Sequence, residues 1–230
     1  MPDLSWRIAS AADPISFRSA ASKAGFQFMP SQPGADFLRG TLTPSGNIPD
    51  DPLPGLLGLP LLSCAELGIE RFRQWPHTPL LTLIISTATA FACDPGTAFA
   101  RALARLDKVA AARQEDLRLC LHEAIANGVL HGNLEIAGGK ARSPEQFLEH
   151  ARLLERRLTD PVLTQRPIEI GADNDGRILT VWVADRGDGF EQRAEGGRGL
   201  DLIGDHCDKY WHENGGNRIV MQFLAGDRTP

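Results

Sequence analysis

Three polar side chains recur at four-residue intervals in the otherwise apolar segment HEAIANGVLHGN, residues 122–133. They are Glu123, Asn127 and His131: a carboxylate, an amide and an imidazole. At the 100° per residue of an α-helix they lie within about 80° of one another, so they share one face. A helix that is apolar nearly all round is usually buried. The segment therefore predicts a polar stripe at the bottom of a site, and an incidental solvated face is the alternative.

A second candidate position is Asp185, which ends the apolar strand in VWVADRGDGF. A carboxylate at a strand end can accept a hydrogen bond from an exocyclic amine. Gly187 and Gly189 follow, and glycines allow the backbone to approach a flat ring or to bend sharply. An ordinary Asp/Gly turn is the alternative. A calcium loop is disfavoured because the acids after Asp188 have the wrong spacing.

A third candidate is the segment EGGRGLDLIGD, which places Gly196, Gly197 and Gly199 just before or within the first turn of a helix. Free N–H groups and the positive end of the helix dipole bind phosphate well, and Arg198 adds a cation at the same place. The segment is neither a Walker A loop nor a Rossmann fingerprint, because it lacks the GK[ST] ending and a GxGxxG in a first strand–helix turn. A flexible linker before a helix is the alternative.

Regular elements that could position these residues begin near residue 80. The predicted strands are LLTLIIST, RPIEIGAD, RILTVWVAD and NRIVMQFLA. The predicted helices are DPGTAFARALARLDKVAAAR, QEDLRLCLHEAIANGVLH, SPEQFLEHARLLERRL and GRGLDLIGDHCDKY. Asp94 is the expected N-cap of the first helix and Ser143 that of the third.

Residues 1–79 have a different character, because most of the 16 prolines lie there. Several fall in PSGNIPDDPLPGLLGLPLL, and this stretch cannot hold long helices. SWRIAS, DPISFRSAASKAGF and QFMP predict a strand, a helix and a strand. We therefore expect two parts: residues 1–79, a small α/β module or extension of unknown function, and residues 80–230, which hold the three candidate motifs.

The composition fits a globular protein, with 42% hydrophobic and 23% charged residues among 230. The net charge of −5 argues against broad nucleic-acid binding. No apolar run reaches the roughly 18–20 residues that span a bilayer, and the first residues lack the features of a signal peptide. A cytoplasmic protein with neither a membrane nor a nucleic-acid partner is the expectation.

Taken in order, EAIANGVLHGN, DRGDG and GGRGLDLI resemble the N box and the two glycine boxes of the GHKL superfamily, the histidine kinase-like ATPases. NGVLHGNLEI, and GRGLDLI leading to GGNRIVMQF, look closest to the anti-sigma-factor serine/threonine kinases. The resemblance covers about residues 80–225 and leaves 1–79 unexplained. It implies an α/β (α+β) two-layer sandwich, in which a mixed sheet carries helices on one face: the Bergerat-type ATP-binding fold.

The resemblance also implies residue roles. Asn127 would coordinate Mg²⁺ at the phosphates of ATP, Glu123 would be the general base, and Asp185 would bind the adenine amino group. An asparagine oxygen is an acceptable ligand for Mg²⁺, and a carboxylate one turn away can accept a proton. The other ATP-binding residues implied are His131, Gly187, Gly189, Gly197, Arg198, Gly199 and Leu200.

The activity implied is phosphorylation of a small STAS-type antagonist protein, which switches partners with a sigma factor or response regulator. A homodimer is expected by family analogy. The sequence departs from many relatives in its short ATP lid, FEQRAEG. A short lid is expected to give weak nucleotide retention or to need closure by a partner protein. A nucleotide-sensing or nucleotide-free regulator is therefore the second hypothesis. A histidine-kinase-like phosphotransfer protein is the third hypothesis. It would need a phosphoacceptor histidine on a dimerising helical hairpin, but His77 lies in the poor helix former QWPHTP and His122 lies within the N box.

Overall fold

The computed structural model describes residues 6–10, 12, 14–24, 26–30, 38–45, 51–59, 61, 63–66, 79–137, 143–189 and 198–225. Their strands form one nine-stranded sheet in the order β2-β3-β1-β4-β5-β6-β7-β9-β8. The strands are β1 (Trp6–Ser10), β2 (Phe26–Pro30), β3 (Leu38–Pro44), β4 (Ser63–Glu66), β5 (Leu81–Ser86), β6 (Pro167–Asn174), β7 (Ile178–Ala184), β8 (Lys209–Glu213) and β9 (Arg218–Leu224). Of these neighbours, β4 and β5 pair in parallel and the rest are antiparallel. The predicted mixed sheet is confirmed.

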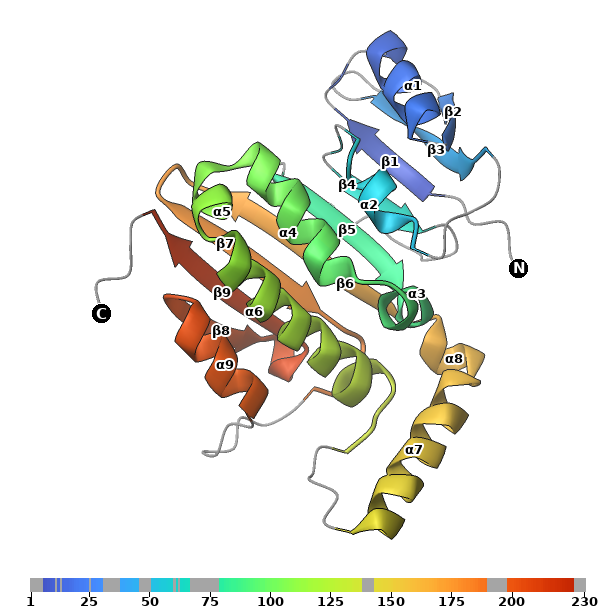
Figure 1. The fold of residues 1–230 in the computed structure, drawn as a ribbon, viewed down its shortest axis with the longest axis vertical. Coiled ribbons are helices and arrows are strands. Elements are labelled where there is room, and N and C mark those ends of the chain that lie inside the picture. Colours follow the sequence, from blue (N-terminus) through green and yellow to red (C-terminus); the bar gives the residue numbers. More distant parts are fainter. Residues whose placement is uncertain are drawn as a thin grey trace.

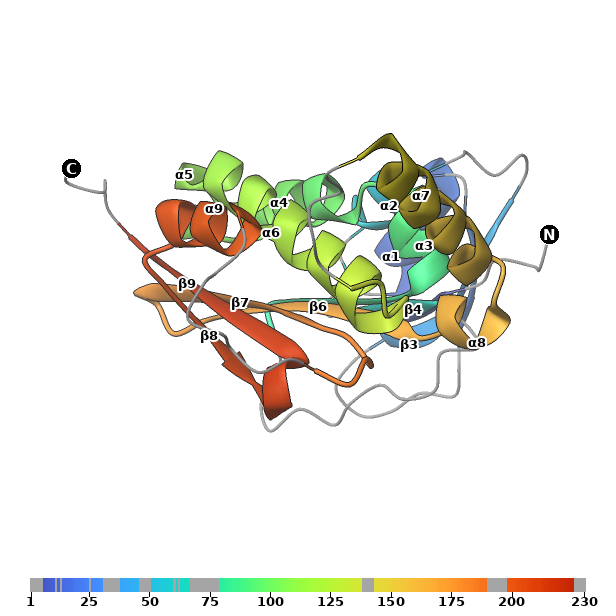
Figure 2. The same cartoon turned by 90° about the horizontal axis from the view of Figure 1, so that it is seen from below.

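The larger helices cover one face of the sheet (Figures 1 and 2). The helices are α1 (Pro14–Lys23), α2 (Leu53–Leu56), α3 (Thr87–Ala92), α4 (Pro95–Leu106), α5 (Lys108–Ala112), α6 (Gln114–Asn127), α7 (Pro144–Leu158), α8 (Pro161–Thr164) and α9 (Arg198–His206). A π turn, η1 (Gly128–Asn133), continues α6, and a 3₁₀ turn, η2 (Asn214–Gly216), joins β8 to β9. The predicted α/β sandwich with helices on one face is confirmed.

The predicted helix starts are confirmed by their caps. The Asp94 side chain accepts a hydrogen bond from the N–H of Thr97 at 3.0 Å, and the Ser143 hydroxyl accepts one from the N–H of Gln146 at 3.3 Å. Each bond satisfies one of the N–H groups that a helix leaves unpaired in its first turn.

Two predicted helices differ from the structure. The helix expected from Asp94 onward is divided into α4 and α5, because Asp107 takes an extended conformation and accepts a hydrogen bond from the N–H of Ala110 at 2.9 Å. Aspartate is one of the preferred N-cap residues, and here Asp107 is the N-cap of a new helix. The helix expected in GRGLDLIGDHCDKY ends at His206, because Lys209 begins β8 and pairs with Gln222 of β9.

The N-terminal strands belong to the same sheet as the rest of the chain. β4 pairs with β5 in the register Ser63↔Thr82, and the carboxylate of Glu66 accepts hydrogen bonds from the N–H of Ser86 and the hydroxyl of Thr89, both at 2.9 Å. Glu66 therefore binds the beginning of α3. The described N-terminal residues extend the sheet beyond β5.

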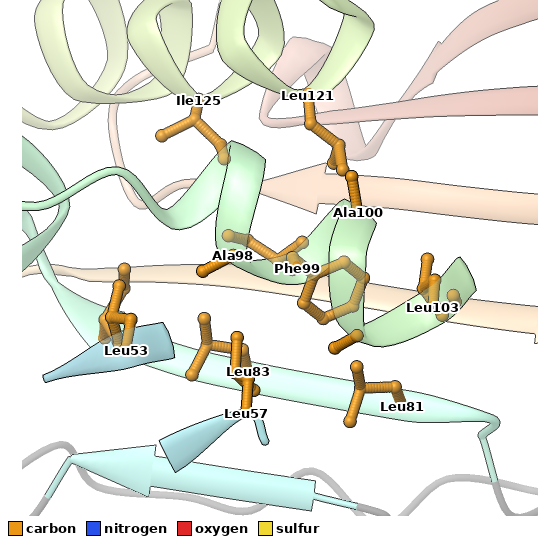
Figure 3. Close-up of a cluster of buried hydrophobic side chains, with 14 of the residues drawn as sticks. Leu53, Leu57, Leu81, Leu83, Ala98, Phe99, Ala100, Leu103, Leu121 and Ile125 are labelled. Atoms are coloured by element: carbon orange, nitrogen blue, oxygen red, sulfur yellow. The ribbon is translucent and has the colours of Figure 1, made fainter. Parts of the chain in front are cut away.

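One hydrophobic core joins these parts (Figure 3). Phe99 of α4 is fully buried and lies among Leu57 beside α2, Leu83 of β5 and Leu121 of α6. Burying each such side chain contributes about 1.5–3 kcal/mol of transfer free energy. Since α4 separates α6 from β5, this packing fixes the position of α6, the helix that carries the polar stripe.

Candidate functional site

Helix α6 carries the apolar face that its sequence predicts. Leu117 and Leu121 are fully buried and Ile125 is 5% exposed, whereas Glu123 and Asn127 are half-buried. The buried face packs against α4 and the sheet, and α9 lies beside α6 in both views of the fold (Figures 1 and 2). Glu123 and Asn127 therefore lie where a side chain contacts both protein and solvent.

Beyond Asn127 the helix widens. In η1 the N–H of Leu134 donates to the carbonyl of Val129, five residues earlier, at 2.9 Å. A π turn holds more residues than an α turn, and within this turn it is Gly132 that lies against Asp185. The side chain of His131 is exposed, and its Nδ1 lies 2.7 Å from the carbonyl oxygen of Ile136. The common face predicted for Glu123 and Asn127 is confirmed, since both lie beside Gly199, and the role of His131 stays a prediction.

The middle of the α6–η1 helix faces the beginning of α9. We call this group, Glu123, Asn127 and Gly199, the phosphate end of the site, after the role that the resemblance implies for it. A Cβ placed on Gly199 would lie 2.7 Å from Glu123 Oε2 and 3.5 Å from Asn127 Nδ2. Only a glycine allows so close an approach. Arg198 is exposed and Leu200 is half-buried in the same first turn, and Gly197 lies outside the described residues. The structure thus brings the carboxylate and the amide to a helix N-terminus.

The last turn of the same helix faces the loop after β7. We call this group, Gly132, Asp185 and Gly187, the base end of the site, again after the role that the resemblance implies. A Cβ on Gly132 would lie 2.5 Å and 2.8 Å from the two carboxylate oxygens of Asp185, and a Cβ on Gly187 would lie 2.5 Å from the carbonyl oxygen of Gly132. Gly189 has a φ of +76°, and a side chain there would meet Asn217 Oδ1. The three residues predicted in DRGDG therefore lie against η1 and the turn before β9.

Asp185 is held by hydrogen bonds on one carboxylate oxygen. Its Oδ1 accepts from the N–H of Gly187 at 2.8 Å and from Nδ2 of Asn217 at 3.5 Å. Burial raises the pKa of the Asp185 carboxyl above its ordinary value, and these two hydrogen bonds offset part of the rise. Its Oδ2 accepts no hydrogen bond from the described residues and can accept one from a ligand.

Two asparagines that were not singled out as site residues contact this loop. Asn133 is fully buried at the end of η1, and its Oδ1 accepts from the N–H of Arg186 at 2.7 Å. Asn217 lies just before β9, and its main-chain carbonyl oxygen accepts a hydrogen bond from the N–H of Asp185 at 3.0 Å. Both were visible in the sequence, as the amide after Gly132 and the amide after a Gly-Gly pair. An amide beside a turn is too common a pattern to be assigned without its partners.

A cavity of about 360 Å³ borders the same loop. It is lined by Glu169, Ala184, Asp185, Arg186, Gly187, Asn214 and Asn217. The Asp185 loop is therefore not enclosed by packed apolar side chains on this side, so its conformation depends on hydrogen bonds.

Helix α9 is anchored at its far end. The guanidinium of Arg113, 8% exposed, donates to Asp116 at 2.7 Å, to Asp208 at 3.1 Å and to the carbonyl of His206 at 3.0 Å. His206 also lies 2.8 Å from Asp116. Charged hydrogen bonds of this kind are the stronger class. They tie the C-terminal end of α9 to the beginning of α6, and so place the N-terminal end of α9 beside Glu123.

Comparison with known proteins agrees with this arrangement. The family model described as histidine kinase-like ATPase domain matches residues 94–223, more than half of the chain. No curated protein matches the chain. Helices long and apolar enough to cross a membrane are not found among the described residues. The chain belongs to the histidine kinase-like ATPase domain family, and this membership supports ATP binding.

Proposed function

We propose that this protein is an ATP- and Mg²⁺-dependent serine/threonine kinase of the anti-sigma type, which phosphorylates an antagonist protein in a partner-switching pathway. One observation carries the proposal. Glu123 and Asn127, one turn apart, face Gly199 at the start of α9, while Asp185 contacts the next turn of the same helix at Gly132. In this proposal a single helix contributes to both the phosphate site and the base site.

Each end suits one part of the nucleotide. The free Oδ2 of Asp185 can accept a hydrogen bond from the adenine amino group, with Gly187 and Gly189 beside the ring. The first turn of α9, with Arg198, Gly199 and Leu200, offers N–H groups and a cation to the phosphates. Gly197 and His131 remain predicted phosphate contacts.

The residues present suit a magnesium ion. The side chain of Asn127 makes no hydrogen bond with the described residues and lies beside a helix N-terminus, so its amide oxygen is available as a ligand. Bound Mg²⁺ would neutralise charge on the phosphates. Glu123, one turn earlier, would accept the proton of the substrate hydroxyl as that oxygen attacks the terminal phosphate. The substrate class is a serine or threonine of a STAS-type protein, itself exchanged with a sigma factor or response regulator.

The first experiment is a calorimetric titration of the full chain with ATP and Mg²⁺. We expect saturable binding by the parent and a loss of about tenfold or more in Asn127→Ala, since the metal loses its protein ligand. Gln114→Ala, an exposed amide on the same helix, is the matched control and should bind as the parent does. Equal binding by Asn127→Ala would contradict the assigned role.

The second experiment measures phosphate transfer to candidate antagonist proteins. Glu123→Gln should still bind ATP but should transfer phosphate about 10²- to 10⁴-fold more slowly, because the amide cannot take a proton. Glu115→Gln, exposed in the first turn of α6, is its control. ATP binding without any transfer by the parent would favour the nucleotide-sensing regulator, and acid-labile phosphate on a histidine would favour the phosphotransfer protein.

A further inference from the structure

We propose that Asn133 and Asn217, here called the asparagine pair, are positioning residues that give the site its selectivity for adenine by fixing the loop Asp185–Gly187. The inference rests on the proposed function, because it concerns how that site distinguishes one purine from another. Neither residue is assigned a contact with the nucleotide. They act through the carboxylate of Asp185.

Asn133 holds the loop from the side of η1. Its Nδ2 donates to the hydroxyl of Thr87 at 2.8 Å and to the carbonyl of Pro167 at 3.1 Å, and these groups belong to α3 and β6. Its Oδ1 accepts from the N–H of Arg186 at 2.7 Å. One fully buried amide therefore joins η1, the beginning of α3, the beginning of β6 and the loop, and both its nitrogen and its oxygen bond protein groups.

Asn217 holds the loop from the side of β9. Its carbonyl oxygen accepts from the N–H of Asp185 at 3.0 Å, and its side-chain Nδ2 donates to the carbonyl of Gly187 and, at 3.5 Å, to Asp185 Oδ1. Together the pair binds main-chain groups of three consecutive residues. The main chain of Asn217 binds Asp185, and the side chains of Asn133 and Asn217 bind Arg186 and Gly187. Two different elements thus determine the conformation of one short loop.

Packing alone cannot do this. The side chain of Arg186 is exposed, and Asp185, Arg186 and Gly187 all line the 360 Å³ cavity. Gly187 packs against Gly132 on one side, but on the cavity side packing leaves the loop free to tilt. The hydrogen bonds to the asparagine pair remove that freedom, as interactions that orient a binding group generally do.

The orientation of the Asp185 carboxylate decides selectivity, because only one of its oxygens is left to accept a hydrogen bond from a ligand. Oδ1 accepts from Gly187 and Asn217, whereas Oδ2 accepts from none of the described residues, and Asp185 lines the cavity. A 6-amino purine can donate to this oxygen. A 6-oxo purine places a carbonyl oxygen, which only accepts hydrogen bonds, opposite this carboxylate oxygen, and the site rejects it. If the loop rotates, Oδ2 no longer points at position 6 and the distinction is lost.

The test compares ATP with inosine triphosphate, which carries oxygen in place of the amino group. Both are titrated with Mg²⁺ into the full chain. The parent should bind ATP about 10- to 100-fold more tightly, as expected for a charged hydrogen bond. Asn217→Ala should lose most of its affinity for ATP and keep its affinity for inosine triphosphate, so that the ratio approaches one. Asn217 is half-buried in a surface turn, so this variant tests the pair with the least effect on folding.

Asn214→Gly is the matched control. Asn214 lines the same cavity and has a φ of +55°, which glycine accepts, and its side chain makes no hydrogen bond with the described residues. It should keep the parent ratio. If Asn217→Ala weakened both nucleotides equally, the selectivity role would be wrong and the proposed function would stand. If the parent bound neither nucleotide, both would be overturned.

A measurement without nucleotide tests the holding of the loop itself. Amide hydrogen exchange should show the Arg186 N–H protected in the parent and exposed in Asn133→Ala, with the amides of β6 and β7 unchanged. Exchange that rose throughout the sheet would mean that Asn133 supports the whole fold rather than the loop. Unchanged exchange at Arg186 would contradict the proposal directly.

Discussion

The phosphate end and the base end of the site are built differently. At the phosphate end, the side chains of Glu123 and Asn127 make no hydrogen bonds with the described residues and are half-buried. At the base end, the loop of Asp185 is bound on both sides by the asparagine pair. The hydrogen bonds of the base end are therefore made within the protein, whereas the polar side chains of the phosphate end are left for ligands.

This difference has a physical basis. An amide or carboxylate that still reaches water is solvated and costs little without a partner, whereas a buried polar group without a hydrogen bond costs roughly 1–3 kcal/mol. The buried Asn133 must be satisfied by protein, and Glu123 and Asn127 need not be. Pre-formed groups lose less conformational freedom on binding, so we expect the base end to supply selectivity and the phosphate end to respond to metal and nucleotide.

The largest expected effect comes from filling the base end. In Gly132→Ala the new methyl group would lie 2.5 Å from Asp185 Oδ1, a group that is fixed by hydrogen bonds and cannot move aside. We expect the free energy of unfolding to fall by about 2–3 kcal/mol, the upper range for overpacking, and ATP binding to be lost. Chemical denaturation and calorimetry measure the two quantities. A stable variant that still binds ATP would mean that the base end adapts as easily as the other.

The equivalent change at the phosphate end should be milder. In Gly199→Ala the methyl group would lie 2.7 Å from Glu123 Oε2, the tip of a flexible side chain that can rotate away. The free energy of unfolding should change by less than about 1 kcal/mol, because alanine is also the better helix former. ATP affinity should still fall about tenfold, since the methyl group takes the space beside the first turn of α9. Equal stability losses in the two variants would remove the distinction between the ends.

The smallest expected effect is a gain in stability. Because the pKa of Asp185 is higher in the folded chain than in the unfolded chain, ionising this group destabilises the fold. Its contribution to stability falls as the pH rises through its unfolded pKa and is lowest above its folded pKa. Asp185→Asn should therefore raise the melting temperature at neutral pH and lose this advantage in acid, where the parent carboxyl is protonated. It should also lose selectivity for ATP. A lower melting temperature at neutral pH would show that the ionised carboxylate is stabilising.

The sequence predicted the parts of the site that depend on local pattern. The spacing of Glu123 and Asn127 predicts their common face, and the apolar strand before Asp185 predicts its place at a strand end; the structure has both features. The widening at η1 could not be predicted in the same way. It is stabilised by contacts of Asn133 with Thr87 and Pro167, which are distant in the sequence.

The same reason explains the errors in the fold. The pattern in GRGLDLIGDHCDKY extends the predicted helix through Lys209 and Tyr210, but the pairing of these residues with β9 requires a partner that follows later in the chain. β3 and β4 were not predicted among the prolines, although they complete the described N-terminal part of the sheet. Local pattern favours an element, and long-range pairing decides where it ends.

The parallel pairing of β4 with β5 has a consequence for assembly. Unpaired strand edges invite a second chain to add a strand, and the edge of β5 is already occupied by the protein's own β4. In the described sheet the outer strands are β2 and β8, at opposite ends of the molecule (Figure 1). β2 ends at Pro30, which has no N–H to offer. Copies of this chain that associate strand to strand must therefore meet at the rims of the sheet, far from β5.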